Sequence, residues 1–283
     1  MNQFESTLRT ADGLPLFIQG WDPQDEPRAV VCLVHGLGEH SGRYTHLAEP
    51  LTRAGYALIA LDLRGHGKSG GPRGHTPSFD ALLDDIALLL QEAGKRYPDT
   101  ARFLYGHSLG GLLVLNYVLR RKPMLAGVIA TGAGLHSSLE EQTLKVSFAK
   151  MMGKVLPTVT LATGLDPKDI CRDPRVVAAY QNDPLVHDRS TLAMAKYNFE
   201  AMPYALTHAS EFHLPLLLMH GTADRLTYLS GSQEFADQVP GCTLKLWDGL
   251  CHEIHNEPEQ DQVFAFLLDW LDARSPFPAH TSL

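Results

Sequence analysis

The sequence predicts an α/β protein in which a mostly parallel central sheet is flanked by helices and interrupted by a helical insertion. Short apolar runs rich in β-branched residues recur along the chain, and such runs suit parallel strands that are covered on both faces. Amphipathic helical patterns separate them, and this alternation is typical of a parallel sheet with helices on both sides. From about residue 136 to residue 212 the alternation of strand and helix patterns is interrupted, which indicates an insertion between two strands.

The strands are expected in chain order, beginning with a hairpin at the edge of the sheet. This hairpin covers Thr7–Trp21 and turns at Asp12-Gly13, a dipeptide that favours tight turns. Each later strand is one of the short apolar runs that suit a parallel strand covered on both faces. These strands are expected at Ala29–Val34, Tyr56–Leu61, Arg102–Tyr105, Ala126–Ala130, Leu214–Met219 and Thr243–Trp247.

Helices are expected where apolar residues recur with a helical period. The first ends before Gly55, a stop signal, and the second follows Pro77, which suits a first helical turn. The third follows the Arg102–Tyr105 strand directly, and the last opens at Pro258. The four patterns cover residues 44–51, 79–90, 109–119 and the segment after 258.

The insertion divides the chain into a core at residues 1–135 and 213–283 and a helical cap at residues 136–212. The cap segment shows no convincing strand pattern, and several prolines interrupt its helical pieces. Leu144, Phe148, Met151 and Val155 form an apolar stripe at helical spacing. The stripe packs either on its own domain or, alternatively, along an acyl channel or a membrane surface.

Composition excludes several classes of function. The 283 residues carry a formal charge of −8 and the pI is near 5.9, whereas nucleic-acid binding needs clustered Lys and Arg. The N-terminus does not read as a secretory signal, and no apolar stretch approaches the roughly 18 residues of a membrane span. The four cysteines show no C-x-x-C spacing, so a cytoplasmic location is expected.

The strongest chemical signal is Gly106-His107-Ser108-Leu109-Gly110, a G-x-S-x-G motif between a predicted strand and a predicted helix. In that setting the motif forms a sharp turn that exposes the serine hydroxyl, while the helix N-terminus stabilises a developing anion. The two glycines leave room where strand and helix crowd together. Ser108 is therefore the candidate nucleophile; the alternative is an ordinary helix N-cap.

A serine nucleophile needs a histidine base and an acid that orients it. In folds with this turn the acid and then the base follow on loops after later strands. Asp224 follows the strand that ends at Met219, with Asp248 as its rival. His252 lies just beyond the last strand, with His255 as the alternative.

The oxyanion hole needs two backbone N–H groups. One should come from Leu109, directly after the nucleophile, and the other from the loop His35-Gly36-Leu37-Gly38 after an early strand. The flanking glycines allow the amide of Leu37 to turn inward, which makes it the second candidate donor.

Two other motifs do not carry the chemistry that they suggest. The segment "GHGKSG" at residues 65–70 has dinucleotide-loop spacing, but Gly71-Pro72 follows instead of an apolar helix. His252-Glu253-Ile254-His255 lacks the spacing of a zinc-protease helix, which needs its second histidine at position 256. We therefore expect no metal and no cofactor.

Several segments together resemble the monoacylglycerol lipase group of α/β-hydrolases. They are "HGLGEHSGRY", "DLRGHGKSGG", "GHSLGG", "NDPL", "HGTADRL" and the histidine after "LWDGLC". They occur in the family's order and span residues 35 to about 255, nearly the whole chain. The resemblance implies an α/β-hydrolase fold: a mostly parallel central sheet flanked by helices, with an inserted helical cap.

The resemblance also implies a function and a set of site residues. Ser108, Asp224 and His252 would be the catalytic triad, and Leu37 and Leu109 the oxyanion positions. Glu39, Arg43, His107 and Tyr180 match residues that organise the polar pocket around the glycerol head group; the alternative for Glu39 and Arg43 is a structural ion pair. The implied enzyme is a cofactor-free serine hydrolase that cleaves a small lipid ester and meets membrane surfaces transiently through its cap. The rival functions are a lysophospholipase or broad carboxylesterase and a non-catalytic ligand-binding α/β-hydrolase.

Overall fold

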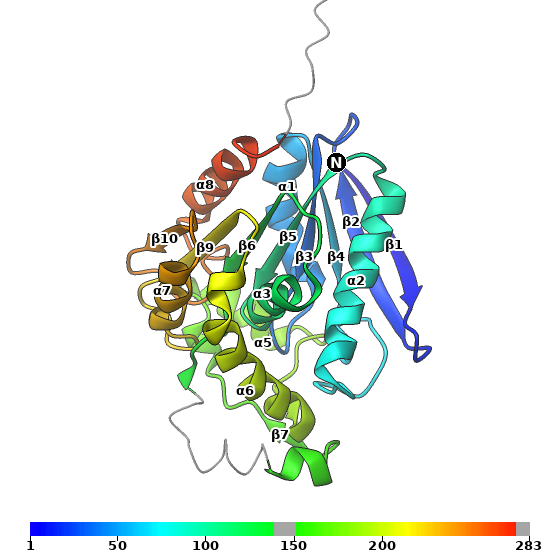
Figure 1. Cartoon of the computed structure of the whole chain (residues 1–283), viewed down its shortest axis with the longest axis vertical. Coiled ribbons are helices and arrows are strands. Elements are labelled where there is room, and N and C mark those ends of the chain that lie inside the picture. The colour runs from blue at the N-terminus through cyan, green and yellow to red at the C-terminus, as the bar shows by residue number, and fades with distance from the viewer. Residues whose placement is uncertain (139–150, 276–283) are drawn as a thin grey trace, which may run out of the picture.

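The computed structural model describes residues 1–138 and 151–275, and its centre is an eight-stranded sheet (Figure 1). The strand order is β1-β2-β4-β3-β5-β6-β9-β10. The pairings of β2 with β1 and β4 are antiparallel, and the remaining neighbours in the sheet run parallel. The strands are β1 (Asn2–Arg9), β2 (Pro15–Asp22), β3 (Ala29–Val34), β4 (Tyr56–Leu61), β5 (Ala101–His107), β6 (Gly127–Thr131), β9 (Leu216–Gly221) and β10 (Thr243–Trp247).

Helices cover both faces of this sheet and complete its core. The apolar residues of α1 and α8 pack with one set of strand side chains, and those of α2, α3 and α7 pack with the set that points the other way. Figure 1 shows α2 and α3 in front of the sheet and α1 behind it. The bounds are α1 (Thr45–Arg53), α2 (Phe79–Arg96), α3 (Leu109–Arg121), α7 (Leu229–Gln238) and α8 (Gln260–Asp272). This layering confirms the predicted fold class.

Each element predicted for the core has a counterpart in the structure, but β1 begins at Asn2, five residues before the predicted hairpin. β3, β4 and β10 have the predicted bounds, whereas β5 continues to His107, directly before the candidate nucleophile. The helix α2 extends to Arg96, beyond its apolar pattern, and begins where the Ser78 hydroxyl accepts a hydrogen bond from the Ala81 N–H. This N-cap explains why the helix starts directly after the Pro77-Ser78 pair.

The chain between β6 and β9 leaves the sheet and forms the insertion. Its described helices include α5 (Pro174–Asn182), labelled just below α3 in Figure 1, and α6 (Leu192–Thr207), nearer its lower end. The expectation that it lacks strands is wrong, because β7 (Thr160–Ala162) and β8 (Arg189–Thr191) pair antiparallel. Each strand has only three residues, and every residue of β7 is exposed, so neither shows a hydrophobic pattern that sequence could reveal.

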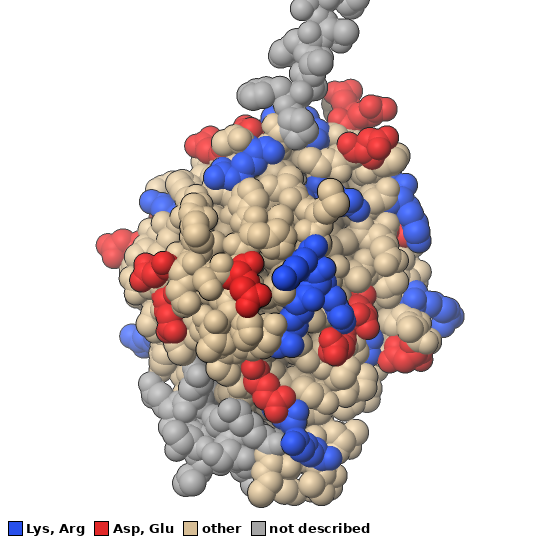
Figure 2. Space-filling model, viewed as in Figure 1, with Lys and Arg blue, Asp and Glu red and all other residues tan. Residues whose placement is uncertain are grey.

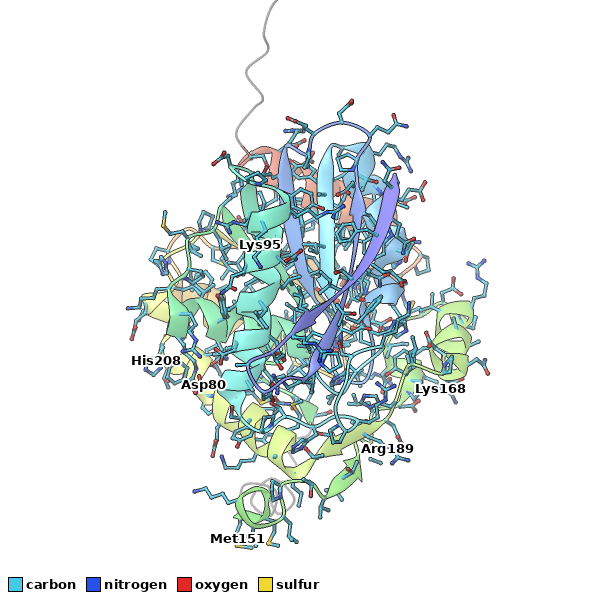
Figure 3. The ribbon with its side chains drawn as sticks, turned by 90° about the vertical axis from the view of Figure 1, so that its right-hand side faces the viewer. Asp80, Lys95, Met151, Lys168, Arg189 and His208 are labelled. Atoms are coloured by element: carbon cyan, nitrogen blue, oxygen red, sulfur yellow. The ribbon has the colours of Figure 1, made fainter. Side chains whose placement is uncertain are left out.

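The apolar stripe predicted for the insertion is only partly visible. Leu144 and Phe148 lie outside the described residues, whereas Met151 and Val155 are 63% and 68% exposed. Met151 lies at the far tip of the insertion (Figure 3). The described part of the stripe therefore faces away from the core.

Charged side chains of both signs share the face that carries α2 and α3 (Figure 2). Arg121 of α3, for example, lies 3.0 Å from both Asp80 and Asp84 of α2. Among the described helices, none combines the length and the apolar character needed to cross a membrane.

Candidate active site

Ser108 lies on a strained turn between β5 and α3. Its backbone has φ +55° and ψ −115°, a conformation that few residues other than glycine adopt. A side chain at Gly106 would place its Cβ 2.2 Å from the Gly110 carbonyl oxygen, and one at Gly110 would lie 2.0 Å from that of Val34. The motif therefore needs both glycines for steric reasons. Ser108 occupies the N-cap position of α3, yet its side chain makes no capping hydrogen bond.

The carboxylate of Asp224 lies against the imidazole of His252, with 2.7 Å between Oδ2 and Nδ1. The N–H groups of Leu226 and Thr227 donate to Oδ1, and the Thr227 hydroxyl donates to Oδ2. Burial alone would raise the pKa of Asp224, but the imidazoles of His252 and His220 outweigh burial and hold it well below its usual range. Asp224 is therefore ionised.

Of the hydrogen-bonded pair Asp224 and His252, the imidazole of His252 is the group that takes up a proton. Burial opposes its charge, but the Asp224 carboxylate outweighs burial, so the pKa of His252 is raised above its ordinary value. Hydrogen bonding through Nδ1 leaves the other ring nitrogen for a reacting group. Such an imidazole can take a proton from a hydroxyl and return it.

Asp248 and His255, the alternative acid and base, make other contacts. Asp248 is exposed and accepts a hydrogen bond from the Thr222 hydroxyl. The His255 ring is buried, stacked on Tyr44 at 4.8 Å and edge-on to His107 at 4.7 Å. Burial and the neighbouring imidazoles keep its pKa well below the ordinary value, so His255 is neutral.

Ser108 and His252 both line a cavity of about 370 Å³ between the core and the insertion. The core contributes Leu112 and Leu226 to its wall, and the insertion contributes Phe199 and Met202. Leu161 of β7 lines the cavity and is also 49% exposed. The cavity is therefore mostly apolar and borders the exposed tip of the insertion.

Leu37 and Leu109 line the same cavity. Within the described residues, neither backbone N–H has a hydrogen-bond acceptor. A Cβ placed on Gly36 would lie 3.1 Å from the Ser108 Cβ, so the loop that carries Leu37 runs directly beside the serine. Two unpaired N–H groups beside a serine can stabilise a negative oxygen.

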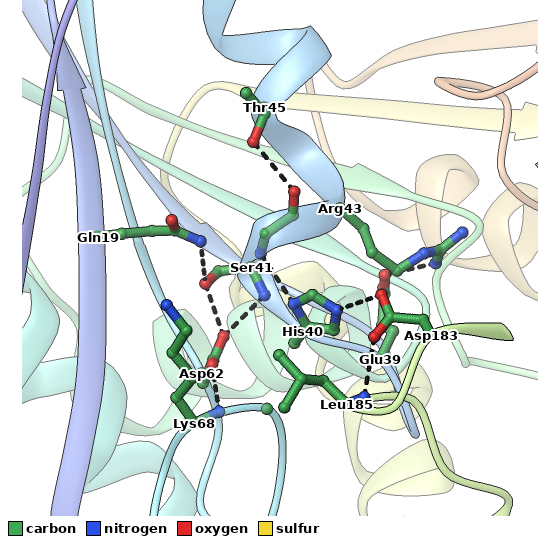
Figure 4. A network of polar contacts seen from close by, with 12 residues as sticks. Gln19, Glu39, His40, Ser41, Arg43, Thr45, Asp62, Lys68, Asp183 and Leu185 are labelled. Atoms are coloured by element: carbon green, nitrogen blue, oxygen red, sulfur yellow. Dashed lines mark hydrogen bonds and ion pairs between the residues drawn. The ribbon is translucent and has the colours of Figure 1, made fainter. Parts of the chain in front are cut away.

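Glu39 and Arg43 form a buried charge network that continues to the histidine loop. Arg43 lies 2.8 Å from Glu39 Oε2 and donates two hydrogen bonds, of 2.6 and 2.7 Å, to the carboxylate of Glu253. Burial would raise the pKa of Glu39, but Arg43 and the nearby imidazoles lower it to about 2. Figure 4 shows Arg43 beside Glu39.

Two of the four residues predicted to bind the head group, Glu39 and Arg43, form this network, and Tyr180 and His107 lie close by. None of the four lines the cavity that contains Ser108. The Tyr180 ring, from α5, lies 4.7 Å from the Arg43 guanidinium. His107 is bonded to the Thr131 hydroxyl at 3.0 Å and packs 4.7 Å from the ring of His252. Their head-group role stays a prediction, and the described contacts of Glu39 and Arg43 are those of a structural ion pair.

The insertion is tied to the loop that carries Leu37. The His187 N–H donates to the Gly38 carbonyl at 2.8 Å, and His40 Nε2 lies 2.8 Å from Asp183 Oδ2 (Figure 4). Gly38 has φ +81°, and a Cβ there would lie 2.3 Å from the His187 carbonyl oxygen. Only glycine permits this close approach.

Sequence reasoning missed three contributors to the site. Thr227 and His220 hold Asp224, and Glu253 anchors Arg43. Their only signal was position, since each lies within four residues of a predicted triad member. Asp183 belongs to the "NDPL" segment, but its sequence position did not indicate that it binds His40.

Comparison with known proteins places the chain among hydrolases. Residues 25–259 match the family described as serine aminopeptidase, S33. The chain is 38% identical over 97% of its length to an uncharacterized abhydrolase domain-containing protein of Dictyostelium discoideum, of which it spans 29%. It is 35% identical to the monoacylglycerol lipase of Mycolicibacterium smegmatis, covering 94% of this chain and 96% of the relative. The crystal structure of Paleococcus ferrophilus monoacylglycerol lipase superposes with a TM-score of 0.83 at 36% identity, covering 97% and 100% of the two chains.

Proposed function

The chain belongs to the serine aminopeptidase S33 family of α/β-hydrolases, and we propose that it cleaves the carboxylic ester of monoacylglycerols to fatty acid and glycerol. The observation that carries this proposal is the mostly apolar cavity that reaches Ser108. Similarity to monoacylglycerol lipases over nearly the whole chain supports the same substrate class.

The lining of the cavity favours a lipid over a peptide. An aminopeptidase has to hold the free amino group of its substrate, which calls for a carboxylate near the nucleophile. Among the described residues, those that line the cavity include no Asp or Glu, and Leu112, Phe199 and Met202 would contact an acyl chain instead. An uncharged acyl chain buries well against such side chains.

In the first half of the proposed reaction, Ser108 attacks the ester carbonyl and His252 takes the hydroxyl proton. Asp224 stabilises the imidazolium that forms, since its ionised carboxylate already faces Nδ1. The carbonyl oxygen becomes an oxyanion between the N–H groups of Leu37 and Leu109. His252 then protonates the glycerol oxygen as its bond to carbon breaks, which leaves the acyl chain on Ser108.

Water completes the cycle. His252 accepts a proton from a water molecule, whose oxygen attacks the acyl-serine carbonyl, and the same two amides hold the second oxyanion. Collapse of this intermediate releases the fatty acid and returns the proton to the serine oxygen. No metal or redox group takes part in this scheme.

We infer that residues 136–212 act as a cap that collects substrate from lipid surfaces. Met151, Val155 and Val159 of this segment are exposed apolar side chains. Leu161 is exposed and also lines the cavity, so it would contact an acyl chain that passes between the two. The occupant proposed for this surface is therefore a lipid aggregate.

The test is fatty-acid release from 1-oleoylglycerol by the purified protein and by its Ser108→Ala variant. Wild-type activity that the variant lacks supports the proposal, and equal activity of both proteins overturns it. Lysophosphatidylcholine and short p-nitrophenyl esters form the comparison panel, because the chain is also 30% identical to a Bacillus subtilis protein named phospholipase. Preference for lysophosphatidylcholine over monoacylglycerol would assign the site to that alternative.

A further inference from the structure

The peptide group that carries the Leu37 N–H is held at its opposite end by a buried histidine. His35 Nδ1 lies 2.7 Å from the carbonyl oxygen of Gly36, which belongs to the same peptide group. A trans peptide is planar, and its C=O and N–H point in opposite directions. The bond to the Gly36 oxygen therefore fixes the direction in which the Leu37 N–H points.

The backbone of the next loop decides which nitrogen of His35 carries the proton. The Leu63 N–H donates to His35 Nε2 at 2.9 Å, so Nε2 is an acceptor and carries no hydrogen. A neutral imidazole has one N–H, which must then be on Nδ1 and donates to Gly36. The ring is fully buried, and burial lowers the pKa of His35, which agrees with the neutral form.

We propose that His35 is a positioning residue that aims the Leu37 N–H at the substrate oxyanion through the Gly36 carbonyl. The inference rests on the proposed ester hydrolysis and adds a residue outside the predicted triad and oxyanion pair. His35 itself does not line the cavity. Its role is therefore indirect and differs from that of a catalytic residue.

The loop needs such a restraint because it is built from glycines. Leu37 lies between Gly36 and Gly38, and glycine lowers the cost of rotating the adjoining peptide groups. The Gly36 N–H already donates to Glu39 Oε1 at 2.6 Å, which fixes the preceding peptide group. On the other side, the Gly38 carbonyl accepts from His187, and His40 bonds Asp183 (Figure 4). The Gly36–Leu37 peptide is held by His35.

Two substitutions separate this role from a general effect on folding. In His35→Asn the side-chain amide nitrogen can take the place of Nδ1 and keep the bond to Gly36. In His35→Gln the longer amide can reach the Leu63 N–H instead, and the bond to Gly36 is lost. The matched control is His66→Gln, because His66 is also a fully buried histidine, packs 5.4 Å from His35, and bonds the Arg64 carbonyl.

Each protein is titrated with a fluorophosphonate so that kcat refers to labelled sites, with p-nitrophenyl butyrate as substrate. Loss of one oxyanion donor typically lowers kcat about 10²–10³-fold, so misdirecting one should cost His35→Gln roughly 10–100-fold. We expect little change in KM for this variant. Its inhibition constant for a trifluoromethyl ketone, which forms an oxyanion on the serine, should weaken by the same factor. His35→Asn and His66→Gln should stay within about threefold of wild type.

Equal losses of kcat per labelled site in His35→Asn and His35→Gln would overturn the inference, as would an unchanged inhibition constant in His35→Gln. Melting temperatures show whether a variant is only less stable, and a less stable protein with wild-type kcat per labelled site also counts against it. Wild-type protein that cleaves the p-nitrophenyl ester but no monoacylglycerol contradicts the proposed substrate alone. Wild-type protein that the fluorophosphonate does not label overturns both proposals.

Discussion

The carboxylate of Asp224 lies 2.7 Å from Nδ1 of His252, although the two residues come from loops after different strands, β9 and β10. Two backbone N–H groups donate to its other oxygen, Oδ1, and the Thr227 hydroxyl donates to Oδ2 beside the imidazole. The carboxylate is therefore oriented before any substrate arrives, and this pair leads to the first two predictions.

Replacing Asp224 by Asn should lower kcat/KM for a monoacylglycerol on the order of 10³–10⁴-fold, because the amide cannot stabilise the imidazolium or hold its tautomer. The matched control is Asp248→Asn, at the exposed rival position, which should stay within about twofold of wild type since surface changes are usually mild. Steady-state kinetics on both variants checks the prediction. A large loss in Asp248→Asn with a small one in Asp224→Asn would assign the acid to Asp248.

The activity should fall as the pH is lowered through the pKa of His252. The base acts in its neutral form, and Asp224 raises the pKa of His252, so the acidic limb of the kcat/KM profile should lie above the ordinary histidine value. Asp224→Asn removes the raising charge, so its residual activity should persist to lower pH. A profile whose acidic limb does not move in this variant contradicts the assignment.

The Arg43 guanidinium is the cation between two buried carboxylates, Glu39 and Glu253. Arg43→Met should lower the free energy of unfolding by about 3–5 kcal/mol, because both carboxylates lose this partner inside the protein. Arg53→Met provides the control, since Arg53 pairs with Glu49 at the same four-residue spacing on the exposed surface and should contribute less than about 1 kcal/mol. Chemical denaturation measures both, and equal effects would refute the argument.

The turn at Ser108 depends on Gly110. Gly110→Ala should prevent folding, because the added Cβ would lie 2.0 Å from the Val34 carbonyl oxygen and 2.7 Å from that of His35. Gly134→Ala should fold normally, since its Cβ would lie 3.6 Å from the Ser108 carbonyl oxygen, an ordinary contact. Soluble yield and thermal melting compare the two, and a Gly110→Ala protein that folds like wild type would contradict this steric argument.

The exposed apolar tip of the insertion should matter only for aggregated substrate. Val155→Ser with Val159→Ser should lower the rate on monoacylglycerol in vesicles roughly tenfold, since each valine loses apolar area that the lipid would bury. The rate on a dissolved p-nitrophenyl ester should not change. Met124→Ser, at a residue that is 91% exposed outside the insertion, is the control and should leave both rates unchanged.

The core was accessible from sequence because its buried strands are continuous apolar runs. The runs at Ala29–Val34 and Tyr56–Leu61 are fully buried and coincide with β3 and β4. In the insertion, burial no longer marks the strands: β7 is exposed along its length. A hydrophobic pattern records burial, so an element that buries little leaves no pattern to read.

In the candidate site, too, some residues could be predicted from sequence and others could not. G-x-S-x-G and the order of acid and base are local signals, and they pointed to Ser108, Asp224 and His252. The contacts that hold Asp224 are also local, from Leu226 and Thr227, but nothing local indicates that they form. The ion pair between the loop of Glu39 and the loop of His252 is long-range, since Arg43 and Glu253 are 210 positions apart. The bond from His35 to Gly36 is local, but its importance depends on the position of the Leu63 amide, which only the folded chain reveals.

The bonds between the insertion and the core also set a boundary for engineering. Asp183 binds His40, the His187 N–H donates to Gly38, and the Thr191 N–H donates to the Gly74 carbonyl at 2.9 Å. A chimera that exchanged the whole insertion with that of a relative would replace these partners together. A graft that ends at Asn182, the last residue of α5, would change the part of the insertion that faces lipid. It would keep Asp183, His187 and Thr191, and with them the host's own bonds to His40, Gly38 and Gly74.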